Sequence, residues 1–269
     1  MADKAVTQVN PIKSLSQQMA AVKSIKDLMV MDIVSKQYIN NYQAFSGATD
    51  GQERFKREAF AMMEIANSKP EIMKCDPMSI FAGFIKTAAY GIPLASKKWS
   101  IYPRGGKLVV DLDAHGKKEM LEKMETIKKV DEGVVVFKGD EFRYNPKLKQ
   151  VTKHEYGTFP TPKASKDNVI AAYCTIHFTD GHTEDVLVTI NQIETARAQS
   201  PMPDGPTWTK HYEEMCKKTT YNRASKIHFK FPDTVVLYKQ YDEPASDVPH
   251  EVIPETMDSS EVTQETVDQ

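Results

Sequence analysis

Residues 213–226, EEMCKKTTYNRASK, combine an apolar helical stripe with a row of cations. At helical spacing the stripe contains Tyr212, Met215, Cys216 and Thr219 and then runs into Arg223 and Lys226. Burial of an unpaired cation costs several kcal/mol. Either an acid such as Glu213 therefore neutralises Arg223 and Lys226, or their face lines a groove that an anion fills. Phosphate fits the second alternative.

Cations and aromatic residues are interleaved in two stretches of the chain. The first stretch contains Lys97, Lys98, Trp99, Tyr102, Arg104 and Lys107, and the second contains Trp208, Lys210, Lys217, Lys218, Tyr221, Asn222, Arg223 and Lys226. Single-stranded nucleic acid is held by such mixtures, because cations follow the phosphates while aromatic faces stack on bases. Two alternatives remain open: Trp99 could belong to the core, and Lys117 and Lys118 could lie on a solvated helix face.

Asp111 and Asp113 are the residues that could support catalysis. Carboxylates two residues apart on a strand share one side and could hold Mg²⁺ in a nuclease. The favoured interpretation is that Asp113 caps the helix that follows. The sequence has no GxxxxGK[ST], GxSxG or HExxH motif. We therefore expect no catalytic residue, no metal site and no cofactor, and keep a Mg²⁺-dependent DNA nuclease as the alternative.

Bulk composition indicates a globular protein rather than a membrane protein. The chain has 269 residues, 40% of them hydrophobic, and no run near the roughly 20 apolar residues of a membrane span. The three cysteines form no CxxC motif, which favours a reduced, cytoplasmic protein. Residues 242–269 carry nine acids and no Lys or Arg, so the remainder is basic, with 35 cations against 28 acids. Such asymmetry occurs in proteins that bind nucleic acid.

Secondary-structure signals predict helices first and antiparallel strands afterwards. Helical periodicity covers 15–42, and Asp76, Pro77 and Gly91 delimit a helix of their own. Residues 99–113 alternate around Gly105-Gly106 and predict a hairpin. Further predicted elements are a helix at 116–129, strand pairs at 134–144 and 169–190, a basic loop at 145–168 between them, and helices at 190–200 and 207–229.

This order of elements predicts an α+β fold with mostly antiparallel hairpins packed against helices. We expect a flexible N-terminus at 1–23, one domain at 24–241 and a disordered acidic tail at 242–269.

Four segments in order resemble the RecT family of phage single-strand annealing proteins, over about residues 24–240. They are CDPMSIFAGFIKTAAYGIPL, KLVVDLDAHGKKEML, VVVFKGDEFRY with its NPKLK continuation, and GPTWTKHYEEMCKKTTYNRASKIHF. The last is the most specific. The sequence departs from the family at 113–116, where relatives tend to show an aromatic residue and a cation before the glycine, so His115 is not an expected contact.

The resemblance implies a protein that binds single-stranded DNA and anneals complementary strands without ATP. It implies rings or helical filaments on DNA, annealed duplex as product, and work beside a phage 5′→3′ exonuclease. A prophage-encoded protein of the bacterial cytoplasm is expected. The acidic tail is a candidate for docking a nuclease or the host single-strand binding protein, with a plain solvated tail as the simpler alternative.

For the groove that the resemblance implies, we expect phosphate contacts from Lys217, Lys218, Arg223 and Lys226, with Tyr221 and Asn222 lining it. The residues 97–107 that carry cations would form a second wall, and Trp99, Tyr102 or Trp208 could stack on bases. Lys117 and Lys210 complete the expected DNA-binding set. The first helices, 24–42, are expected to make subunit contacts, with a buried core as the competing explanation. A self-assembling scaffold with incidental DNA affinity is a third possibility.

Overall fold

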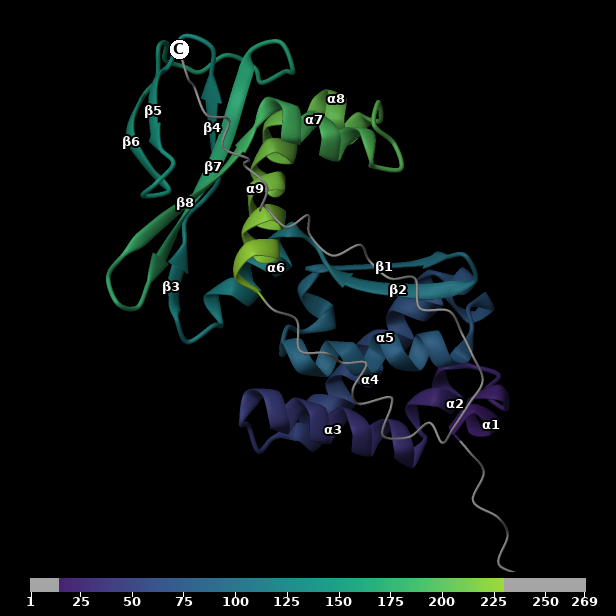
Figure 1. The fold of residues 1–269 in the computed structure, drawn as a ribbon. Coiled ribbons are helices and arrows are strands. Elements are labelled where there is room, and N and C mark those ends of the chain that lie inside the picture. Colours follow the sequence, from purple (N-terminus) through teal and green to yellow (C-terminus); the bar gives the residue numbers. More distant parts are fainter. Residues whose placement is uncertain (1–14, 230–269) are drawn as a thin grey trace, which may run out of the picture. The chain divides into compact units, whose positions relative to one another are not determined.

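The computed structural model describes residues 15–229, and Figure 1 shows their arrangement. Helices combine with antiparallel sheets, which confirms the predicted α+β class. The predicted acidic tail at 242–269 lies outside the described residues. Within the expected flexible N-terminus, helix α1 (Leu15–Ala20) is described, and its Met19 is buried.

The N-terminal part of the described chain is helical. Its elements are α1, α2 (Ile25–Met29), α3 (Asp32–Ser46), α4 (Gly51–Ser68), the 3-10 turn η1 (Pro70–Lys74), α5 (Pro77–Tyr90) and the 3-10 turn η2 (Leu94–Ser96). Aromatic packing joins α3 to α5, where the rings of Tyr38 and Phe84 stack with centroids 4.9 Å apart. Helix α5 begins and ends as predicted, because Asp76 accepts the Ser79 N–H at 3.0 Å and Gly91 takes a φ of 60°.

The hairpin of β1 (Trp99–Arg104) and β2 (Lys107–Leu112) confirms the predicted strand pair. Gly105 and Gly106 take φ values of 57° and 75°, which a two-residue primed turn requires. The Asp76 N–H donates to the Gly106 carbonyl at 2.8 Å, and the Leu108 N–H donates to Ser79 Oγ at 2.9 Å. The hairpin is therefore fastened to the start of α5.

A four-stranded antiparallel sheet follows, with β7 (Val169–Phe178) in its centre. Strand β8 (Thr183–Thr189) pairs along one edge of β7. Because a strand has only two edges, β3 (Ile127–Val130) and β4 (Val134–Phe137) both pair along the second edge of β7. Strand β3 lies opposite Ile176–Phe178, and β4 lies opposite Val169–Tyr173.

Three sequence expectations for this region are wrong. The predicted helix at 116–129 is α6 (Ala114–Glu122), and residues 127–130 form β3 instead, because β7 offers them a pairing edge. Residues 134–144 are not a hairpin: β4 pairs with β7, whereas β5 (Glu141–Asn145) pairs with β6 (Gln150–Glu155). Strand β6 lies inside the predicted basic loop. In each case the pairing partner is distant in sequence or was assigned to a loop.

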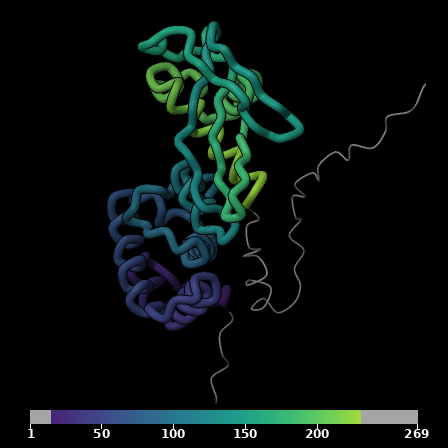
Figure 2. The backbone as a smooth tube through the Cα atoms, turned by 90° about the vertical axis from the view of Figure 1, so that its left-hand side faces the viewer, coloured from purple at the N-terminus to yellow at the C-terminus, as the bar shows by residue number. Residues whose placement is uncertain are grey.

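Helices α7 (Ile190–Ala198), α8 (Pro206–Lys210) and α9 (Tyr212–His228) are the last described elements. The predicted helix at 207–229 is thus interrupted at His211. Alternate residues of β7, among them Cys174 and Ile176, pack with Tyr221 and Ala224 of α9. Figure 2 shows α9, in yellow-green, beside the teal and green strands.

Gly133, between β3 and β4, brings the backbone of the sheet directly against α9. A Cβ at this position would lie 3.0 Å from Lys217 Cα and 2.9 Å from Lys217 Cβ. The Gly133 N–H donates to the hydroxyl oxygen of Tyr221 at 2.7 Å. Sheet and helix are therefore in contact through both packing and a hydrogen bond.

None of the helices within residues 15–229 is long and apolar enough to cross a bilayer.

Candidate nucleic-acid interface

A cavity of about 470 Å³ opens between α6, α7, β8 and α9. Its lining residues are Lys117, Val188, Gln192, Thr195, Ala196, Gln199, Thr219, Asn222, Arg223 and Lys226. We call this cavity the α9 pocket. Three of its residues carry positive charge, the polar remainder offers amides and hydroxyls, and no carboxylate or aromatic ring lines it. This chemistry suits an anion that also accepts hydrogen bonds.

Arg223 and Lys226 supply the cations without partners. Both side chains are exposed, and no ion pair among residues 15–229 includes either of them. Arginine and lysine side chains without a nearby carboxylate keep their full attraction for an incoming anion. The acid that the sequence left as an alternative, Glu213, pairs instead with Lys217 at 2.7 Å.

Helix geometry explains how α9 presents these residues. Its buried stripe proceeds in steps of four through Tyr212, Cys216, Thr220 and Ala224. The predicted stripe passed through Thr219, one position earlier, and therefore into Arg223. Because the buried stripe follows Thr220, Arg223 lies on the neighbouring, pocket-facing side with Thr219. Arg223 and Lys226 are therefore not part of the buried stripe.

Lys117 joins α6 to α9 at the pocket. Its Nζ donates to Asn222 Oδ1 at 3.0 Å and lies 3.8 Å from Asp111 Oδ2. The hydrogen bond connects residues 105 positions apart in the chain. The structure thus gathers four residues of the predicted set, Lys117, Asn222, Arg223 and Lys226, around one cavity.

The other lysines of the second predicted cluster lie elsewhere. Lys217 contacts two carboxylates, Glu213 at 2.7 Å and Glu214 at 3.1 Å. Partial burial alone would lower the pKa of Lys217, but hydrogen bonds to these acids raise it above its usual value. Lys218 is half-buried on α9, Lys210 is exposed on α8, and neither lines the pocket.

Trp208 and Tyr221 are core residues, which corrects their expected place on a DNA-facing surface. Trp208 is 4% exposed and packs against Tyr212, with ring centroids 6.0 Å apart. Tyr221 is 1% exposed, and its hydroxyl donates to Glu132 Oε2 at 2.8 Å. Burial raises the pKa of Tyr221, and the Glu132 carboxylate raises it further. Neither ring offers a face on which a base could stack.

The hairpin residues form a separate surface that contributes nothing to the lining of the α9 pocket. Lys97, Tyr102, Arg104 and Lys107 are exposed. Trp99 is half-buried, and its Nε1 donates to the Ile92 carbonyl at 3.2 Å. Lys98 forms an ion pair with Glu119. The exposed hairpin residues remain a predicted second wall.

Helix α7 supplies pocket residues that the sequence analysis missed. Gln192 and Thr195 of α7, together with its C-cap residue Gln199, recur at i, i+3 and i+7 and line the cavity with polar groups. The sequence signal for these residues was the helical spacing of their polar side chains. The same spacing is also typical of ordinary solvent-exposed helix faces. Only the position of α7 against α9 distinguishes the two.

Asp111 and Asp113 occupy structural positions. Asp113 caps α6, where its Oδ1 accepts the Gly116 N–H at 2.7 Å, as the favoured interpretation predicted. Asp111 lies between Lys86 and Lys117. Across residues 15–229, no cluster of three or more His, Cys, Asp or Glu side chains could hold a metal ion.

Comparison with known proteins identifies the family of the chain. The RecT family model matches residues 53–254, so the chain belongs to the RecT family. The chain is also 26% identical over 156 residues to Protein RecT of Escherichia coli (strain K12). That match spans 58% of this chain and 55% of the curated relative, a little over half its length.

Proposed function

We propose that this RecT family member is an ATP-independent single-stranded DNA-binding and strand-annealing protein of phage homologous recombination. The observation that carries the proposal is the composition of the α9 pocket, in which cations and amides occur without a carboxylate or an aromatic ring. A phosphodiester backbone matches this lining, because its oxygens accept hydrogen bonds and its charge is complementary to Arg223 and Lys226.

The same lining supports a role in annealing rather than in base recognition. A pocket without aromatic rings holds no base by stacking, so a strand gripped here by its phosphates keeps its bases available. A second strand then pairs with it by Watson–Crick hydrogen bonds. Phosphate contacts position a strand without reading its sequence, which suits a protein that acts on any complementary pair.

In this proposal Arg223, Lys226 and Lys117 bind phosphates, and Asn222 lies beside them. The exposed hairpin residues Lys97, Tyr102, Arg104 and Lys107 form a second wall along the strand. Adjacent copies of the chain extend the groove in a ring or filament, so binding is cooperative. The annealed duplex, a phage 5′→3′ exonuclease and the host single-strand binding protein are the proposed partners, and the setting is the bacterial cytoplasm.

The test is an annealing assay with two complementary oligonucleotides, the first incubated with the protein and the second added afterwards. We expect faster annealing with and without ATP, and weaker acceleration as salt rises, because phosphate contacts release counterions. Failure to accelerate annealing at low salt would overturn the proposal.

A denaturing gel of the same labelled strands with Mg²⁺ separates the nuclease alternative. We expect intact strands. Cleavage that Asp113→Asn abolishes would replace annealing by metal-dependent hydrolysis. Electron microscopy with and without DNA separates the scaffold alternative, which requires equal assembly in both samples.

A further inference from the structure

Asp111 of β2 lies between two lysines that come from different helices. Its Oδ1 is 3.4 Å from Lys86 Nζ of α5, and its Oδ2 is 3.8 Å from Lys117 Nζ of α6. The same Oδ1 accepts the Leu112 N–H at 3.0 Å. The carboxylate is therefore held from two sides, with Lys117 its longest contact.

Lys117 is also a member of the α9 pocket, so Asp111 reaches the pocket through it. Its Nζ has a nearer partner in Asn222 Oδ1, at 3.0 Å, and the lysine side chain is 22% exposed. Arg223 and Lys226, by contrast, have no carboxylate partner within residues 15–229. One of the three pocket cations thus carries an internal counter-charge and two do not.

We propose that Asp111 is a built-in anionic competitor for Lys117, which limits how tightly the pocket holds a DNA strand. This inference rests on the proposed function. A phosphate entering the pocket takes over Lys117 from Asp111. The carboxylate keeps Lys86 and the Leu112 N–H, and it is 43% exposed, so the exchange leaves no buried unpaired charge.

The consequence is a reversible grip. Part of the attraction between Lys117 and a phosphate is spent on separating Lys117 from Asp111, so the strand binds less tightly than three unpaired cations would allow. An annealing protein must release or reposition its strand once a duplex forms. Because Asp111 competes for Lys117 alone, it eases release of the strand while Arg223 and Lys226 still bind phosphate.

The test is the salt dependence of binding to a labelled oligo(dT), measured by fluorescence anisotropy on the full chain. Asp111→Asn removes the charge but retains an oxygen that can accept the Leu112 N–H. We expect binding about two- to fivefold tighter at low salt, with a log–log salt slope close to that of the wild type, because Lys117 contacts the phosphate in both proteins. Weaker or unchanged binding would overturn the proposal.

Two further variants make the result specific to Lys117. Glu141→Gln changes the net charge equally and removes one of the two carboxylates beside Lys153 on the β5–β6 hairpin, at 2.7 Å, so we expect wild-type affinity. The double variant Asp111→Asn with Lys117→Met should bind like Lys117→Met alone. A gain in Glu141→Gln, or a gain that survives the loss of Lys117, would show a general charge effect and overturn the proposal.

The Lys117→Met variant tests the inference even if the Asp111→Asn variant does not fold. Its slope should be shallower by about 0.7, and an unchanged slope would overturn the inference. Failure of the proposed function is distinguishable, because the wild-type protein would then neither bind oligo(dT) nor accelerate annealing.

Discussion

The two faces of α9 contrast in what surrounds their polar groups. On the sheet-facing side, the Tyr221 hydroxyl has partners within the fold, because it hydrogen-bonds Glu132 and Gly133. On the pocket-facing side, Arg223 and Lys226 are exposed without an ion-pair partner in the described chain. One short stretch of sequence therefore carries both core residues and the cations of the candidate site.

This contrast shows that a lysine or arginine within a cluster of cations is not for that reason alone a candidate for anion binding. Lys217 belongs to the same helix and the same cluster of cations, but Glu213 and Glu214 neutralise its charge. Arg223, six positions later, has no such neighbours within ion-pair distance in the part of the chain described. What distinguishes the two is the partner that the local fold supplies.

The largest expected effect is on the sheet-facing side. Trp208→Ala removes a buried ring and should lower the free energy of unfolding by about 3–5 kcal/mol, measured by chemical denaturation. Tyr102→Ala, at an aromatic residue that is 43% exposed, is the matched control and should cost less than about 1 kcal/mol. A stable Trp208→Ala variant that fails to bind DNA would break the comparison and make Trp208 a stacking residue.

On the pocket-facing side, Arg223→Ala combined with Lys226→Ala should weaken oligo(dT) binding at least about tenfold at low salt. The log–log slope should become shallower by about 1.4, the value of two contacts on a single strand. Stability should stay within about 0.5 kcal/mol of wild type, because both side chains are exposed.

The matched control for this pair is Lys217→Ala, which removes a cation that already has carboxylate partners and should leave binding near wild type. Equal losses in the control and the double variant would contradict the distinction between paired and unpaired cations. Unfolding of the double variant, seen by circular dichroism, would make Arg223 and Lys226 structural.

Tyr221→Phe sharpens the comparison by removing one buried hydroxyl. The Gly133 N–H and the Glu132 carboxylate each lose a partner, so the free energy of unfolding should fall by about 1–2 kcal/mol. Strand affinity at matched folded concentration should not change. A selective loss of DNA binding would instead place Tyr221 in the groove.

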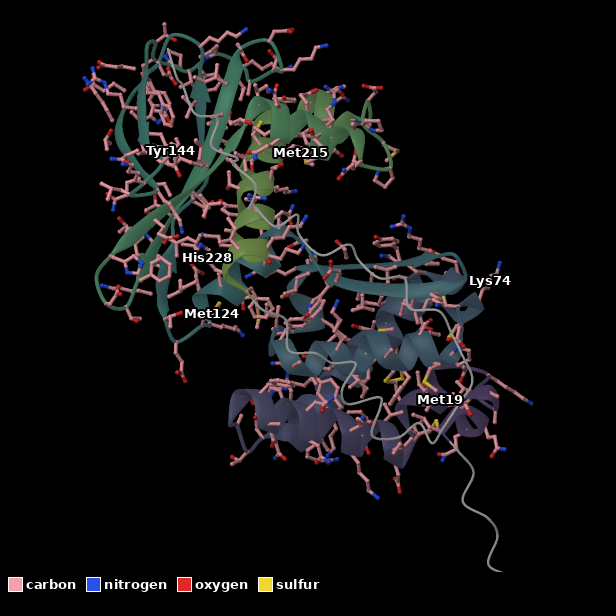
Figure 3. All side chains as sticks on the ribbon, in the orientation of Figure 1. Met19, Lys74, Met124, Tyr144, Met215 and His228 are labelled. Atoms are coloured by element: carbon pink, nitrogen blue, oxygen red, sulfur yellow. The ribbon has the colours of Figure 1, made fainter. Side chains whose placement is uncertain are left out.

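The smallest expected effect concerns pH and His228, in the last turn of α9 (labelled in Figure 3). Burial lowers the pKa of His228, and the Glu184 carboxylate, 3.6 Å from its Nε2, opposes this only in part. Lys149 and His182 nearby lower it further. Because the unfolded chain binds the proton more readily, stability is fully present above about pH 6.5 and is lost as pH falls through the lower folded pKa.

Melting temperatures at pH 7.5 and 5.5 measure this effect. The fall on acidification should be smaller in His228→Gln than in the wild type, since the substitution removes the group that titrates. An equal fall in both proteins would show that other groups account for the pH dependence.

Local signals in the sequence were sufficient for several elements. The Asp76 cap, the Gly91 terminus and the Gly105-Gly106 turn depend on residues within a few positions of one another, and the structure confirms all three. Strand β3 was missed because its conformation depends on β7, whose paired residues begin almost fifty positions later in the chain. The local pattern of residues 116–129, which was interpreted as a helix, contains no information about this distant strand.

The places of the predicted α9 residues depended on which side of that helix is buried. Helical spacing allowed either Thr219 or Thr220 to continue the buried stripe, and only packing against the sheet selects Thr220. Trp208 was predicted as a possible stacking platform and Tyr221 as a groove residue, but both rings are buried. Composition indicated the helix that carries the candidate site, whereas tertiary packing decides which of its residues line the pocket.

The close approach of Gly133 to Lys217 has a kinetic consequence. The Gly133 backbone lies directly against Lys217, and its N–H hydrogen-bonds the Tyr221 hydroxyl, so α9 is held to the sheet at two neighbouring points. In the proposed function, Arg223 and Lys226 are then already in place when a strand arrives, and we expect no slow rearrangement after first contact. Association should therefore be a single step whose rate rises linearly with strand concentration and is set by diffusion and ionic strength.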